Sequence, residues 1–137
     1  MGDQEYAVVI DLGVAPEQAV EAVREVFAAA GFGILYQIDM RQTFRDKLQK
    51  EFRFYTILGV CDPQLAHRGL EIHPDMGLVI PCNVVVQELE GRGTVVKAVR
   101  APRSWDLLGS RDLVAVGEQA EARVREALDH LTQRAQA

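Results

Sequence analysis

The sequence predicts an α+β fold, in which a mainly antiparallel sheet of about five strands carries helices on one face. Two segments have apolar residues at helical spacing, and several short runs are rich in β-branched residues. The turn Glu90–Gly93 contains two glycines and joins two of these runs into an antiparallel hairpin. With 137 residues, 48% of them hydrophobic, the chain should form a single domain. Its core should cover about residues 6–132, between short flexible termini.

The first half of the chain predicts two strands and two helices. Tyr6–Leu12 is short and β-branched, as strands are. Pro16 occupies the first turn of a helix that ends before Gly31, because proline fits a helix start and glycine a helix end. Phe32–Asp39 alternates as a strand, and Met40–Glu51 predicts a short amphipathic helix on the surface.

The second half predicts three strands and two helices. Asp62 followed by Pro63 marks the start of a short helix that runs to about Leu70, because the carboxylate accepts from free backbone N–H groups. The remaining elements are the strands Phe52–Val60, Val79–Leu89 and Thr94–Val99 and a long helix from Leu113 to Leu131. The predicted order is therefore β-α-β-(α)-β-α-β-β-α.

Charge and composition exclude several classes of protein. The net charge of −5 argues against binding to nucleic acid or to an anionic membrane. The N-terminal segment is acidic and polar, unlike a signal peptide. The most apolar window, Gly77–Val86, has about half the length of a membrane span. We expect a cytoplasmic protein whose two cysteines are reduced thiols.

Cys61 is the first residue with a chemical interpretation. It lies directly before the helix cap at Asp62. Free N–H groups at a helix start lower the pKa of a thiol, whereas the neighbouring carboxylate raises it. The sequence leaves the direction of the net shift open. Cys61 is either a functional thiol and weak candidate nucleophile or a packed, inert residue.

Cys82 and Asn83 begin a second segment of interest. Alternation places Leu78, Ile80 and Cys82 on one apolar face, which favours a buried thiol. Asn83 points the other way, among valines, and needs hydrogen-bond partners from the protein or from a ligand. Pro81 marks a bulge, a strand start or an edge.

Two histidines, His67 and His73, lie between the cysteines in the sequence and suggest two further kinds of site, a metal site and a catalytic base. Cys61, Cys82 and His67 are weak candidate metal ligands, but their spacing is unlike that of zinc motifs. His67 or His73 could act as a base for a nucleophilic Cys61, although no third residue to orient the base is visible. No phosphate-binding, dinucleotide-binding or serine-nucleophile motif is present, and nothing in the sequence identifies a reaction.

The strands also predict self-association. Neighbouring strand residues of both parities are apolar, for example Val84 with Val85 and Val95 with Val96. If helices cover one face of the sheet, the other face exposes apolar side chains that favour burial against a second copy. We expect a homodimer.

Three segments resemble the domain-of-unknown-function 302 family of small bacterial and archaeal proteins. They are GFGILYQID, EFRFYTILGVCDPQLA and MGLVIPCNVVV, which start at Gly31, Glu51 and Met76. The resemblance implies a curved antiparallel sheet of the TATA-binding-protein-like kind and dimers, and it implies no activity. The positions that match the family's motifs are Cys61, Asp62, Pro63, Pro81, Cys82 and Asn83. Members often continue after the last strand with an acidic residue, a proline and two methionines, where this chain has Arg100–Trp105.

These observations lead to one favoured hypothesis and two alternatives. The favoured hypothesis is a homodimeric binding module that holds a small ligand, a sulfur species or a soft metal, with Cys61, Asp62, Cys82 and Asn83 as its binding residues. No cofactor is predicted beyond these ligand classes. The alternatives are a cysteine-dependent enzyme and a purely structural or protein-interaction module.

Overall fold

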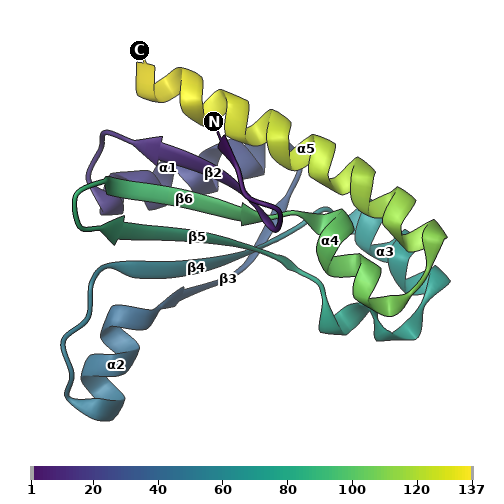
Figure 1. Cartoon of the computed structure of the whole chain (residues 1–137), viewed down its shortest axis with the longest axis horizontal. Helices are drawn as coiled ribbons and strands as arrows, with labels where there is room; N and C mark the ends of the chain where they lie inside the picture. Colours follow the sequence, from purple (N-terminus) through teal and green to yellow (C-terminus); the bar gives the residue numbers. More distant parts are fainter. Residues whose placement is uncertain (1, 137) are drawn as a thin grey trace.

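Six strands form one antiparallel sheet in the order β1-β2-β6-β5-β4-β3 (Figure 1). The structure is a computed structural model and describes residues 2–136, so the expected flexibility of Met1 and Ala137 lies outside the described residues. The strands are β1 (Gly2–Asp3), β2 (Ala7–Leu12), β3 (Gly33–Asp39), β4 (Tyr55–Cys61), β5 (Cys82–Leu89) and β6 (Gly93–Val99). The helices are α1 (Pro16–Ala29), α2 (Met40–Leu48), α3 (Pro63–Ile72), α4 (Ala101–Trp105) and α5 (Arg111–Gln136), with the 3₁₀ turns η1 (Pro74–Leu78) and η2 (Asp106–Leu108).

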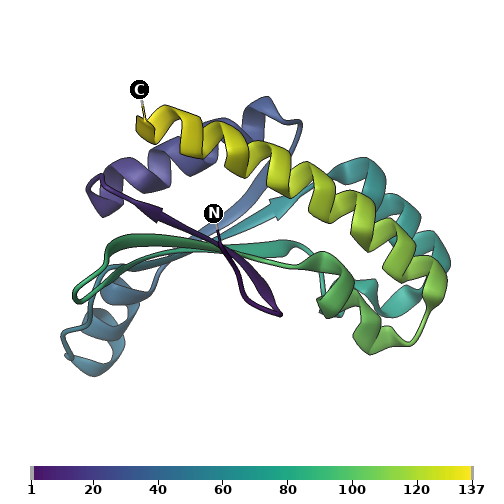
Figure 2. The same cartoon turned by 45° about the horizontal axis from the view of Figure 1, so that its top comes forward.

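The predicted α+β class and the helices on one face are confirmed. Helices α1 and α5 lie across the same side of the curved sheet (Figure 2). Helix α2 has no buried residue and projects from one end of the sheet, as a surface helix should (Figure 1). The strand number is six rather than about five, because Gly2 and Asp3 pair with Val9 and Val8 and add a short edge strand.

Three local predictions differ from the structure. Strand β5 begins at Cys82 and not at Val79, because η1 occupies the preceding segment and leaves Leu78 81% exposed. Strand β4 begins at Tyr55 rather than Phe52. The short helix α4 was not predicted, since its five residues carry too little periodicity to show in the sequence.

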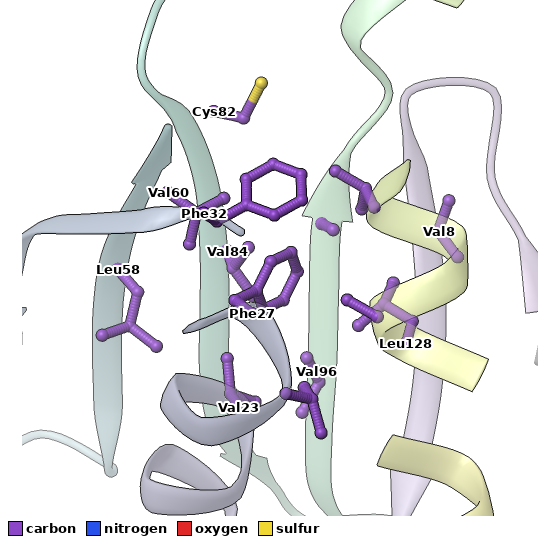
Figure 3. Close-up of a cluster of buried hydrophobic side chains, with 14 of the residues drawn as sticks. Val8, Val23, Phe27, Phe32, Leu58, Val60, Cys82, Val84, Val96 and Leu128 are labelled. Carbon is purple, nitrogen blue, oxygen red and sulfur yellow. The ribbon is translucent and has the colours of Figure 1, made fainter. Parts of the chain in front are cut away.

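The core lies between the sheet and the two long helices (Figure 3). Val23 and Phe27 of α1 and Leu128 of α5 are fully buried against the sheet. The strands contribute every second residue to this core, as the pleat requires, and these include Val8, Leu58, Val60, Val84 and Val96. Among residues 2–136, no helix combines the length and apolar character needed to cross a membrane.

On the opposite face of the sheet, the described helices leave the middle uncovered (Figure 2). One row of side chains crosses this face from strand to strand. In register, it consists of Ile38, Ile57, Val85, Lys97 and Val9. All five are half-buried or exposed, so the row is apolar, apart from its lysine, and reachable by solvent.

Tyr36 and Gly59 form a close cross-strand contact on this open face. The two residues are partners in the β3–β4 register, directly after an irregularity in the pairing. A Cβ added to Gly59 would meet the Tyr36 ring at 2.5 Å. The ring therefore lies on the glycine backbone, and its hydroxyl donates to Oδ1 of Asn83 on β5.

We expect Gly59→Ala to destabilise the protein. The added methyl group displaces the Tyr36 ring and breaks its hydrogen bond to Asn83, at a cost of about 1–3 kcal/mol in the free energy of unfolding. Urea denaturation measures this loss. Gly13→Ala is the matched control, because a Cβ at Gly13 meets nothing within 4 Å. Equal stability of the two variants would contradict the contact.

Candidate functional site

The end of strand β4 brings together a thiol and a buried carboxylate. Cys61 is the last strand residue, and Asp62 caps helix α3 as predicted. One Asp62 oxygen accepts hydrogen bonds from the backbone N–H groups of Gln64 and Leu65, at 3.1 and 3.4 Å. Asp62 is only 6% exposed. The cap therefore fixes the direction in which the chain leaves Cys61.

Arg123 of helix α5 holds this carboxylate from the other side. Its guanidinium donates to the second oxygen of Asp62 and also to the backbone carbonyl of Ala30, at the end of α1. It lies 5.6 Å from the centre of the Phe32 ring. Gly31, with φ of 91°, allows this approach, since a Cβ there would come within 2.9 Å of the guanidinium. One side chain thus connects α1, α3 and α5.

Cys82 approaches the same region from the neighbouring strand. It is the first residue of β5 and pairs with Val60, so it lies beside the end of β4. Pro81, whose peptide bond to Ile80 is cis, directly precedes Cys82 and marks the strand start, one of the predicted alternatives. Figure 3 shows Cys82 at the end of the core beyond Phe32 and Val60. The residue is 7% exposed, which confirms a buried thiol.

Both cysteines line one small hollow. Its other walls include Phe32, Leu65 and Trp105, and its surface is almost entirely apolar. The free volume of about 20 Å³ exceeds the roughly 10–15 Å³ that one water requires. The hollow therefore has room for about one additional heavy atom.

Burial keeps both thiols protonated at neutral pH. It raises the pKa of Cys61, and the Asp62 charge raises it further. The pKa of Cys82 is raised to about 12, first by burial and then by the nearby Cys61. The direction that the sequence left open is thus upward. A thiol with a raised pKa is a weaker nucleophile at neutral pH than a thiol whose pKa is lowered.

The remaining candidate residues lie outside this hollow. Asn83 faces the open side of the sheet, as alternation predicted, and its oxygen accepts from Tyr36. The exposed His67 pairs with Glu71 at 3.1 Å, and His73 accepts from the backbone of Asp75. Within residues 2–136 no three His, Cys, Asp or Glu side chains are grouped for a metal ion. Of the four predicted binding residues, the structure therefore brings together Cys61, Asp62 and Cys82.

Sequence reasoning missed two residues of the site. Arg123 is one of several charged residues on α5, and nothing in its spacing singles it out. Trp105 is the only tryptophan in the chain, but it lies in the segment where the sequence departs from the pattern of the family it resembles. That Trp105 is the single tryptophan was the one feature of the sequence that could have drawn attention to it. This feature does not indicate that the residue lies beside the cysteines.

Comparison with known proteins identifies the family. A family model described as "Domain of unknown function DUF302" matches residues 8–131. The chain belongs to the DUF302 family. A crystal structure of an uncharacterized conserved DUF302 protein from Bacillus stearothermophilus superposes with a TM-score of 0.85. The sequences are 24% identical, and the match covers 92% of this chain and 98% of the other. That likeness supports the DUF302 fold. Comparison with curated proteins gives no match.

The raised pKa values predict slow alkylation of the native DUF302 protein. At about pH 7, iodoacetamide should modify Cys61 more slowly than it modifies glutathione, and Cys82 should react only after unfolding. The Cys61 rate should increase with pH, as the thiolate forms. Peptide mapping by mass spectrometry distinguishes the two sites.

Asp62→Asn tests the contribution of the Asp62 charge, which adds to burial in raising the pKa of Cys61. Removing the neighbouring negative charge should lower the pKa of Cys61 and accelerate its alkylation. Asp75→Asn, an exposed substitution on η1, provides the control and should leave the rate unchanged. A native Cys61 that reacts faster than glutathione would contradict the raised pKa.

Proposed function

We propose that this protein is a cytoplasmic binding module, which holds a small soft species between Cys61 and Cys82. The single observation that supports the proposal is that both cysteines are among the residues that line one hollow with room for about one heavy atom. Organic ligands of ordinary size need pockets of about 300–1,000 Å³, so they do not fit in this hollow. A sulfane sulfur atom or a soft metal ion does.

The chemistry of the walls supports the same ligand classes. Thiol sulfur is a soft, polarisable donor that selects soft metals and sulfur species over hard cations. Among the residues that line the hollow, the one carboxylate is that of Asp62, which is already engaged by Arg123 and by the α3 backbone and is therefore not free for a hard cation. A reducing cytoplasm would keep both thiols available.

Binding of a soft probe tests the proposal. Silver ion serves as the soft-metal probe and sodium tetrasulfide as the sulfur probe, each added to the reduced full-length chain. We expect one silver ion or one added sulfur atom per chain in native mass spectrometry. Cys61→Ser and Cys82→Ser should each weaken silver binding more than about a hundredfold, because changes in outer-shell partners alone cost up to that factor.

The pH dependence of silver binding tests whether both thiols are ligands. Both thiols are protonated at neutral pH, so silver binding to both sulfurs releases two protons, and its apparent affinity should increase on the order of a hundredfold per pH unit. His67→Ala is the control and should leave binding unchanged, since the imidazole lies outside the hollow. Failure of both probes to bind the folded chain would remove the proposal.

We also propose that the protein forms a homodimer, in which the open face of the sheet packs against a second copy of the chain. The row that crosses this face consists of three apolar residues on β3, β4 and β5, followed by Lys97 and Val9. Within this row, the Ile38 residue leaves 40% of its surface exposed to solvent. Burial against another copy removes this apolar row from water.

Ile57→Lys tests the dimer, because it places a charge at the centre of the apolar row. Sedimentation should give a dimer for the natural chain and a monomer for this variant at the same concentration. Leu70→Lys on α3, a residue that is 47% exposed, is the matched control and should leave the dimer intact. A monomeric natural chain would refute the assembly, whereas a dimeric Ile57→Lys variant would refute this interface.

A further inference from the structure

A groove on the open face of the sheet is large enough for an organic ligand. Its free volume is about 340 Å³, against about 20 Å³ for the hollow beside the cysteines. Ligand pockets in proteins measure about 300–1,000 Å³, so the groove has the size of a small-molecule site. The residues that line it include Tyr6, Tyr55, Val85, Lys97 and Val99.

The strand order shows how the groove runs. Tyr55 lies on β4 and Tyr6 directly precedes β2, with strands β5 and β6 between them. Neighbouring strands are about 4.8 Å apart, so this part of the face spans about 14 Å. Apart from Lys97, its floor is mainly aliphatic and includes Val85 on β5 and Val99 on β6. An extended alkyl chain fits such a floor better than a compact polar molecule does.

Lys97 brings a positive charge into this apolar groove. In register it lies between Val85 and Val9, and the residue is half-buried. Its Nζ is 3.4 Å from Oε1 of Gln4, in the turn between β1 and β2. Figure 2 shows this turn projecting from the sheet on the side away from α5. Because Tyr6 belongs to the same turn, the ammonium group lies toward the Tyr6 end of the groove.

The ammonium group of Lys97 forms no ion pair with a carboxylate in the part of the chain that the structure describes. The nearby Asp3 pairs instead with Arg125, at 2.8 Å. Glu5, in the same turn as Gln4, pairs with Arg103 at 3.8 Å. The partner that remains for Lys97 is the neutral amide oxygen of Gln4. A half-buried ammonium group over apolar side chains, with a neutral partner, is stabilised by a bound anion.

We propose that this groove binds a small organic carboxylate with an alkyl chain, a medium-chain fatty acid anion. The carboxylate pairs with the ammonium group of Lys97, and the alkyl chain lies over the valines toward Tyr55. The charge and the apolar floor together select this class. An inorganic anion gains nothing from the floor, and a neutral hydrocarbon leaves the lysine unpaired. The inference goes beyond the two-thiol site and uses no residue of it.

The groove lies on the face that the proposed homodimer buries, and it shares Val85 and Lys97 with the row that crosses that face. Burial of Lys97 against a second copy would be unfavourable without a counter-ion. A bound carboxylate supplies one, so ligand binding and dimer formation are compatible. Because every residue that lines the groove belongs to one chain, ligand binding does not depend on the dimer.

Titration of the full-length chain with sodium octanoate tests the inference, and 1-octanol serves as the neutral probe with an alkyl chain of the same length. NMR of the valine methyl groups follows both titrations. One octanoate should bind per chain, about tenfold more tightly than octanol, because only the carboxylate pairs with Lys97. The methyl resonances of Val85 and Val99 should shift, whereas those of Val23 in the core should not.

Lys97→Met separates the charge from the shape of the groove. The variant keeps an unbranched side chain and loses the ammonium group, so the preference for octanoate over octanol should disappear. Lys47→Met is the matched control, because Lys47 is exposed on α2 and lies outside the groove. It should keep the preference of the natural chain. The comparison of the two probes on the natural chain does not depend on the folding of either variant.

Equal affinity of the natural chain for octanoate and octanol would overturn the inference. Octanoate binding that leaves Val85 and Val99 unshifted would overturn it as well, and so would a preference for octanoate that persists in Lys97→Met. A dimer that binds no octanoate would refute this inference alone. A monomeric natural chain that binds octanoate as expected would refute only the homodimer.

Discussion

The contact between Asp62 and Arg123 is the interaction on which the arrangement of this end of the molecule depends. Asp62 is buried at the junction of β4 and α3, where it caps the helix and accepts from Arg123 of α5. The same guanidinium reaches Ala30 and lies against Phe32, so the ends of α1 and β4 are fixed to α5. Since a buried carboxylate without its partner would be strongly unfavourable, these elements stay together in the folded state.

The hollow beside the two thiols follows from this arrangement. Strand β4 ends at Cys61 and β5 begins at Cys82, and α3, α4 and α5 contribute to the walls of the space beyond them (Figure 1). A small gap with apolar walls, lined in part by Trp105, remains at this end of the core. The hollow therefore lies where the sheet and the helix layer end, and several elements contribute to its walls.

Local signals in the sequence predicted most of the fold. Pro16 and Gly31 bound α1, Asp62 caps α3, and the glycines after Glu90 turn β5 into β6, because these residues act on their own backbone. Long-range packing decided the elements that were missed or displaced. Strand β1 exists only through its pairing with β2, and β5 begins late because η1 packs Met76 into the core.

The candidate site also combines features that local sequence signals predicted with features that arise from long-range packing. The sequence by itself determined that Cys61 stands at the junction of a strand and a helix, that Asp62 caps that helix and that Asn83 faces away from Cys82, since capping and alternation are local rules. Only the tertiary structure decided that both cysteines line one hollow with Trp105 and that Arg123 engages Asp62. Trp105 lies 23 residues beyond Cys82, and Arg123 lies 61 residues beyond Asp62. Contacts over such separations arise from the packing of layers, which no local pattern records.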